Sequence, residues 1–157
     1  MKNKKGFTLV ELLAVIVILS LIMAIAVVGI SGVIQNAKTS TFKQTAANII
    51  DGVRKQLLIN NSLEEGYYTF TSAILEKGGK ESPFGGNINY ATSCSGTQVT
   101  TGICKVASNP GCSKNGTSYV RIESDKSAKI CLTTDTGDRY INLVSEAALL
   151  GSGDVIS

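Results

Sequence analysis

An uncharged apolar run near the N-terminus limits what this chain can fold into more than any other feature. It covers 24 residues, from Phe7 to Ile30, and no charged residue occurs between Leu12 and Asn36. Four positions interrupt it: Thr8, Glu11, Ser20 and Gly29. As an α-helix the run would be about 36 Å long, which is enough to cross a hydrocarbon core of about 30 Å. The sequence therefore predicts a helix that spans a membrane once.

Three lysines precede the apolar run and account for the whole net charge of +3: Lys2, Lys4 and Lys5. Because positive charge on a short flanking segment stays on the cytoplasmic side, they predict a cytoplasmic N-terminus and place the rest of the chain outside. After Gly6, the remaining 12 Lys and Arg residues equal the 12 Asp and Glu residues. This balance offers no basic excess to a polyanion, so the charge predicts no nucleic-acid partner.

The helical pattern continues past the membrane run to about residue 60. No proline occurs before Pro83, and the polar segment Asn60-Asn61-Ser62 predicts where the helix ends. Apolar residues recur at steps of mostly three and four, with polar residues between them: Val33, Ile34, Ala37, Phe42, Ala46, Ile49, Ile50, Val53 and Leu57. The helix is therefore expected to be apolar all round in its first half and amphipathic in its second half, where one stripe packs on a globular body.

The rest of the chain predicts a small β-sheet head. Residues 61–116 are rich in Gly, Ser, Thr and Asn and predict loops, apart from one short helix over 71–77 that ends at Gly78-Gly79. Three later runs alternate as strands do and are joined by short turns: 118–123, 128–134 and 139–144. The predicted fold class is α+β, with a long N-terminal α-helix packed on a small antiparallel sheet.

Four cysteines lie in the part predicted to be outside the cytoplasm: Cys94, Cys104, Cys112 and Cys131. An even number in a small extracytoplasmic domain predicts two disulfides, and the sequence leaves the three possible pairings open. A structural zinc site is the alternative, but no pair has the C-x-x-C spacing that such sites prefer. We expect neither a metal nor another cofactor.

The chain contains no histidine, which excludes Ser-His-Asp and Cys-His catalysis, His-containing zinc sites and HExxH proteases. Two acidic pairs, Glu64-Glu65 and Asp135 with Asp138, are more typical of solvated surface than of acid–base or cation sites. No recognisable catalytic constellation remains, so we expect a protein that is not an enzyme.

The residues GFTLVELL, after the lysine leader, resemble the class III signal of type IV pilins and of the pseudopilins of secretion and competence systems. The resemblance implies that a prepilin peptidase cuts between Gly6 and Phe7 and methylates the new N-terminus at Phe7. It also gives Glu11 a purpose, since a carboxylate in an apolar run is costly unless it finds a partner. Glu11 can neutralise the Phe7 amine of its own chain or of a previously added subunit, and so set the register of a filament.

By this resemblance the chain is a structural subunit of a type IV pilus, a helical surface filament that serves adhesion, motility or uptake. Residues 1–6 are a leader that is removed, 7–30 a transmembrane and then filament-core helix, 31–60 its amphipathic continuation, and 61–157 the head. The implied partners are the membrane, further copies of the chain, the prepilin peptidase, the pilus assembly ATPase and its inner-membrane platform protein. The precursor is expected in the cytoplasmic membrane and the mature subunit in an extracellular filament.

Three alternatives stay open. A pseudopilin of a type II secretion or competence system has the same start and the same filament logic. A secreted binding domain or enzyme, released by signal peptidase after Ala26, is suggested by the A-x-A pattern Ala24-Ile25-Ala26. An ordinary single-span anchor is the third. Against the last two, Glu11 has no role in a discarded or purely anchoring segment, and the amphipathic stripe begins shortly after Ala26.

One departure from the family pattern lies in the middle of the helix. Many relatives carry proline at the position of Val28, whereas this chain has Gly29 and Gly32 close by. Each glycine in a helix interior weakens the helix by roughly 1 kcal/mol relative to alanine. We therefore expect the weakest part of the helix near these two glycines.

Overall fold

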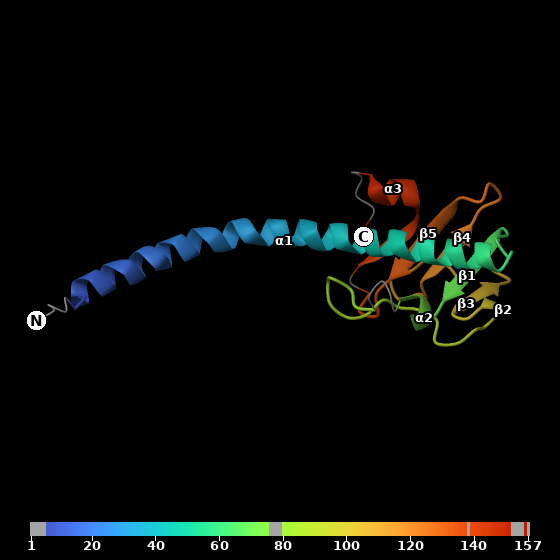
Figure 1. The fold of residues 1–157 in the computed structure, drawn as a ribbon, viewed down its shortest axis with the longest axis horizontal. Coiled ribbons are helices and arrows are strands. Elements are labelled where there is room, and N and C mark those ends of the chain that lie inside the picture. The colour runs from blue at the N-terminus through green and yellow to red at the C-terminus, as the bar shows by residue number, and fades with distance from the viewer. Residues whose placement is uncertain (1–5, 76–79, 138, 152–155, 157) are drawn as a thin grey trace, which may run out of the picture. The chain divides into compact units, whose positions relative to one another are not determined.

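The computed structural model describes residues 6–75, 80–137, 139–151 and 156, with Val28 described in its backbone only. The lysine leader, the predicted glycine stop at 78–79 and Asp138 lie outside the described residues. The chain divides into two compact units, Met1–Ala37 and Lys38–Ser157. One helix, α1, runs without interruption from Leu9 to Ile59, in agreement with the predicted long helix (Figure 1).

The C-terminus of α1 is closed by the polar segment that the sequence indicated. Asn61 adopts a left-handed backbone conformation with φ of 51°. This places its N–H 3.1 Å from the Leu58 carbonyl oxygen and the Ser62 N–H 2.8 Å from the Leu57 carbonyl oxygen. These are the two bonds of a Schellman motif, in which asparagine tolerates the conformation that usually calls for glycine. They satisfy carbonyl groups that the helix itself leaves unpaired.

Within the second unit, one face of α1 is buried. Burial starts at Phe42, and the residues concerned continue the predicted stripe: Ala46, Ile49, Ile50, Val53 and Leu57. Val33 and Ile34, which belong to the same sequence pattern, are 68% and 46% exposed in the single chain. The apolar stripe of α1 therefore packs against the head only from Phe42 onward.

The head contains one six-stranded antiparallel sheet with the strand order β2-β3-β1-β4-β5-β6. The strands are β1 (Gly66–Phe70), β2 (Thr97–Thr100), β3 (Ile103–Val106), β4 (Tyr119–Ile122), β5 (Ala128–Thr133) and β6 (Tyr140–Ser145). Strands β4, β5 and β6 form the predicted meander, with ends within one or two residues of the expected ones. The α+β fold class is confirmed.

The expectation of loops with little regular structure over residues 61–116 was wrong, because β1, β2 and β3 lie there. Strand β1 occupies the centre of the sheet and buries Tyr68 and Phe70 completely. Strands β2 and β3 form a hairpin around Gly102, whose φ of 88° suits a tight turn. Strand β1 has apolar residues on both faces, and the short β2 and β3 stand among polar residues, so none of them shows the alternation that predicts a strand.

The core lies between the stripe of α1 and one face of the sheet. Strand side chains alternate between the two faces, and one set joins the stripe in a single buried cluster: Tyr68, Phe70, Val120, Ile122, Ile130 and Leu132. Two short helices, α2 (Ser72–Leu75) and α3 (Glu146–Leu150), complete the head. An ion pair of 2.9 Å between Arg54 and Glu146 ties α1 to α3.

We expect Ile50→Ala to destabilise the head by about 2–5 kcal/mol, because it removes a fully buried side chain and leaves a cavity between α1 and the sheet. The measurement is denaturant unfolding of the full chain in detergent, followed by near-UV circular dichroism. Leu58→Ala is the matched control, since Leu58 lies on the same helix but is 54% exposed. Equal destabilisation by both changes would contradict the packing described here.

Candidate functional site

Gly6 and Phe7 directly precede α1 and are both exposed. The φ of Gly6 lies outside the left-handed region, and no described atom lies within 4 Å of the position that a Cβ on Gly6 would occupy. Phe7 is 89% exposed. Among the described residues, therefore, nothing in the fold requires glycine at position 6 or an aromatic ring at position 7. Their identity has to be explained by something other than the packing of a single chain.

Thr8 and Glu11 form a reciprocal cap at the N-terminus of α1. The carboxylate of Glu11 accepts hydrogen bonds of 2.9 Å from both the backbone N–H and the hydroxyl group of Thr8. In return, the Thr8 hydroxyl accepts a bond of 3.3 Å from the Glu11 backbone N–H. This is a capping box, and the negative charge also lies at the positive end of the helix dipole.

The cap gives Glu11 a partner in the single chain that sequence reasoning missed. The signal was present, since Thr-x-x-Glu before an apolar run is the pattern of a capping box. The structure thus brings Glu11 together with Thr8, whereas the sequence pointed only to the Phe7 amine.

The part of α1 in the first unit is apolar on all sides and exposed. Every large apolar side chain with a described position from Leu9 to Ile34 is at least 46% exposed. Its two serines donate back to the helix backbone, Ser20 to the Ile16 carbonyl and Ser31 to the Val27 carbonyl. By length and composition α1 is long and apolar enough to cross a membrane. Internal satisfaction of polar groups is what a helix in hydrocarbon requires.

The two glycines expected to mark the weakest part of the helix leave it unbroken in the single chain. Residues 29 and 32 are both helical, and a Cβ on either would meet no described atom within 4 Å. The helix therefore offers two open positions on its surface here, and their effect on its strength stays a prediction.

The four cysteines are joined as Cys94–Cys104 and Cys112–Cys131, with Cα–Cα distances of 5.6 and 5.8 Å. Each bond links a loop to a strand, because Cys104 lies in β3 and Cys131 in β5. Both strand cysteines face away from α1, since they alternate with core residues such as Ile103 and Leu132. The disulfides therefore hold two loops against the outer face of the sheet.

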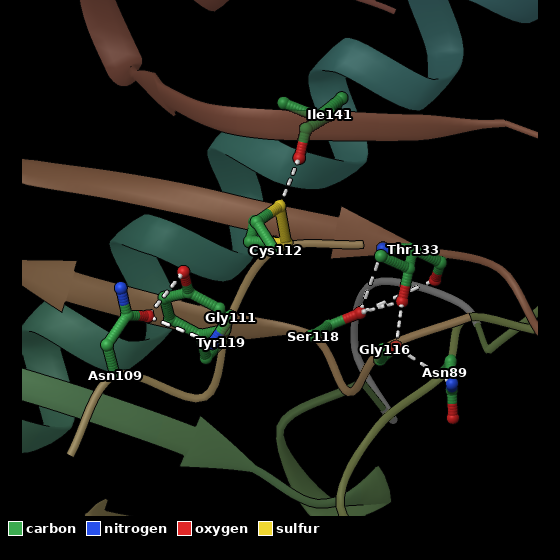
Figure 2. The surroundings of a disulfide bond; sticks show 10 residues. Asn89, Asn109, Gly111, Cys112, Gly116, Ser118, Tyr119, Thr133 and Ile141 are labelled. Carbon is green, nitrogen blue, oxygen red and sulfur yellow. Dashed lines mark hydrogen bonds between the residues drawn. A yellow bond between two sulfur atoms is a disulfide. The ribbon is translucent and has the colours of Figure 1, made fainter. Parts of the chain in front are cut away.

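A buried hydroxyl network fixes the second of these loops (Figure 2). Ser118 and Thr133 are both fully buried, and the Thr133 hydroxyl donates to the Gly116 carbonyl. The Asn89 amide donates to the same carbonyl at 2.8 Å. Near the start of the loop, before Cys112, the Asn109 side chain accepts a hydrogen bond of 3.1 Å from the Tyr119 hydroxyl. Polar atoms buried here are thus paired, and the loop is held at several points besides Cys112.

Two of the acidic residues singled out from the sequence, Glu64 and Asp135, make structural contacts. Glu64 pairs with Lys105 at 2.6 Å, and the hydrogen bond from that ammonium lowers the pKa of the Glu64 carboxyl below its usual value. Asp135 accepts a bond of 2.8 Å from the Asn87 backbone N–H. Within the described residues, no group of three or more His, Cys, Asp or Glu side chains has the arrangement of a metal site.

We expect non-reduced full-length protein to react with an alkylating agent at none of its four cysteines. Under graded reduction, Cys94 and Cys104 should become labelled before Cys112 and Cys131, because Cys94 is exposed whereas Cys112 is only partly exposed and Cys131 is fully buried. Peptide mass spectrometry at each reductant concentration measures the order. Four reactive thiols without reductant, or the reverse order, would contradict the disulfides or their placement.

One family model matches the chain, and it covers the N-terminal segment described above. Residues 1–27 match the model described as "Prokaryotic N-terminal methylation motif". No curated protein and no solved structure matches the chain. The matched residues include Gly6, Phe7, Thr8 and Glu11 and extend into the exposed apolar part of α1. At its N-terminus the chain therefore carries the prepilin signal of type IV pilins and pseudopilins.

Proposed function

We propose that this chain is the subunit of a type IV pilus, processed after Gly6, methylated at Phe7 and assembled through α1 into a surface filament. One observation carries the proposal: the methylation motif continues into a helix whose first part is apolar all round and has no partner among the described residues of the single chain. Exposed apolar surface of this extent marks a membrane or protein interaction site. In the precursor, the membrane covers this apolar surface. In the filament, the helices of neighbouring subunits cover it.

Gly6 and Phe7 fit the processing step. Because no described residue packs where a Gly6 side chain would be, the glycine is best explained by an enzyme that must approach the backbone closely. Phe7 is exposed and directly precedes the cap residue Thr8, so the cut leaves the capping box intact. The helix is thus retained whole for assembly.

The capping box also supports a role for Glu11 in assembly. Both hydrogen bonds that Thr8 gives to Glu11 go to one carboxylate oxygen, Oε2. The other oxygen is available to a cation, and processing creates one, the amine of Phe7. In the filament, this amine of a previously added subunit would lie among apolar helices, where an unpaired charge is costly. Pairing Glu11 with it favours the one step between subunits that brings the two groups together.

The same proposal gives the chain a place and partners. The precursor spans the cytoplasmic membrane once, and the filament forms outside it from copies of the chain. Processing needs the prepilin peptidase, and extraction from the membrane needs the assembly ATPase with its platform protein. The role is structural and uses no catalytic residue.

We expect Gly6→Val to leave uncleaved precursor in the membrane, because a branched side chain blocks access to the peptide bond. Gly32→Ala is the control, since Gly32 is also a glycine with open space around it but lies outside the cleavage site. The measurement is the intact mass and N-terminal sequence of the chain recovered from the membrane fraction and of the protein sheared from the cell surface. An N-terminus at Met1 or at Val27 in the wild-type extracellular protein would refute the proposed processing. Scarce surface protein with correct processing would point to a pseudopilin.

We expect Glu11→Gln to abolish filaments while Thr8→Val retains them. Glutamine still completes a capping box but carries no charge, whereas Thr8→Val removes the capping hydroxyl and keeps the charge. Removing one partner of a buried ion pair destabilises a contact between two subunits by about 3–5 kcal/mol. This loss recurs at every subunit along the filament. Surface filaments are counted against the membrane pool of processed subunit, with each variant as the sole source of protein.

Normal filaments from Glu11→Gln alone would show that charge pairing does not set the register. Loss of filaments in Thr8→Val, with a normal pool of processed subunit, would show instead that the cap itself is what assembly requires.

A further inference from the structure

A pocket of about 320 Å³ lies on the sheet face that points away from α1. Its floor contains Thr69 of β1 and Val106 of β3. Thr69 lies between the core residues Tyr68 and Phe70 in the strand, so its side chain belongs to the opposite face. The volume is at the lower end of the range of about 300–1,000 Å³ that is typical of small-molecule sites.

The walls of the pocket are the two loops that the disulfides hold. Residues 91–95 form one wall next to Cys94, and residues 108–117 contribute the other, which contains Cys112. Gly96 lets the end of the first loop lie directly against the backbone of β3, because a Cβ there would overlap the Lys105 carbonyl oxygen. The second loop is fixed by the hydroxyl network of Figure 2. The pocket is therefore preformed, and a ligand would order little of it on binding.

The lining is rich in hydroxyl groups and carries no ionisable side chain. Six of the nine lining residues are serine or threonine: Thr69, Thr92, Ser93, Ser95, Ser108 and Thr117. Of these six hydroxyls, only that of Thr69 makes a hydrogen bond to the described residues, and it donates to the Cys104 carbonyl. The other five hydroxyls are free to donate and to accept. A charged ligand would find no counter-charge here, which disfavours its desolvation.

We propose that this pocket binds a neutral carbohydrate, with one pyranose unit in contact with the hydroxyl-bearing walls. A sugar presents several hydroxyl groups that both donate and accept, as the lining does. The remaining lining residues, Ala91, Val106 and Pro110, are apolar and suit the C–H groups of a sugar ring. The inference rests on the pocket alone and does not depend on how the chain is processed or assembled.

The test is saturation-transfer NMR on the full-length protein in a detergent whose headgroup contains no sugar. The probes are the methyl glycosides of glucose, galactose, mannose, N-acetylglucosamine and N-acetylgalactosamine, with glucosamine and N-acetylneuraminic acid as charged comparators. The double variant Ser95→Ala, Thr117→Val removes one hydroxyl from each wall, and Ser108→Trp fills the pocket. Thr97→Val is the matched control, since Thr97 is exposed on β2 outside the lining.

At least one neutral glycoside should receive saturation from the wild type and from Thr97→Val with equal Kd. The double variant should raise that Kd roughly tenfold, as the loss of two hydrogen bonds predicts, and Ser108→Trp should abolish the signal. Circular dichroism and non-reducing mass spectrometry verify that each variant is folded and oxidised. No signal from any neutral glycoside, a signal from the charged probes alone, or binding unchanged in both pocket variants would overturn the proposal.

Discussion

The head depends on the packing of one stripe of α1 against one face of a twisted antiparallel sheet. From Phe42 to Leu57 the helix supplies side chains that are fully or almost fully buried, and the strands supply Tyr68, Val120 and Ile130 from the facing side. Since strand residues alternate, the other face carries a different set of side chains, which includes Tyr119, Val106 and both disulfides. The division of the sheet into a hydrophobic side and a cross-linked side thus follows from where the helix lies.

Clear local patterns in the sequence predicted the elements that they span, and elements without such a pattern were missed. The stripe of α1 repeats over several turns, and the last three strands alternate clearly between short turns, so both were correctly predicted. Strand β1 was missed because GYYTF has apolar residues on both faces and no alternation to detect. It is a strand because β3 and β4 pair with it on either side, which is information from distant parts of the chain.

The candidate site shows the same contrast. Gly6, Phe7 and Glu11 stand in a short contiguous motif that the sequence alone displays, and Thr8 was within reach of the same reasoning. The partners of the cysteines were not, because Cys94 and Cys112 acquire them only when β3 and β5 take their places in the sheet. The hydroxyl-lined pocket is likewise invisible in sequence, since serines and threonines from three separate segments meet there.

The placement of both disulfides on the outer face separates the loops from the core of the head. A disulfide fastens each loop to a strand. A change in the length of a loop therefore alters only the entropic cost of closing a surface segment. That cost rises slowly with the number of residues. The turn at Lys114–Asn115 is exposed and lies beyond the Cys112 attachment. A foreign peptide carried at this turn would leave the packing of the helix on the sheet untouched, but it would displace Lys114 from the Tyr140 ring and the Asn115 carbonyl from the Asn89 amide.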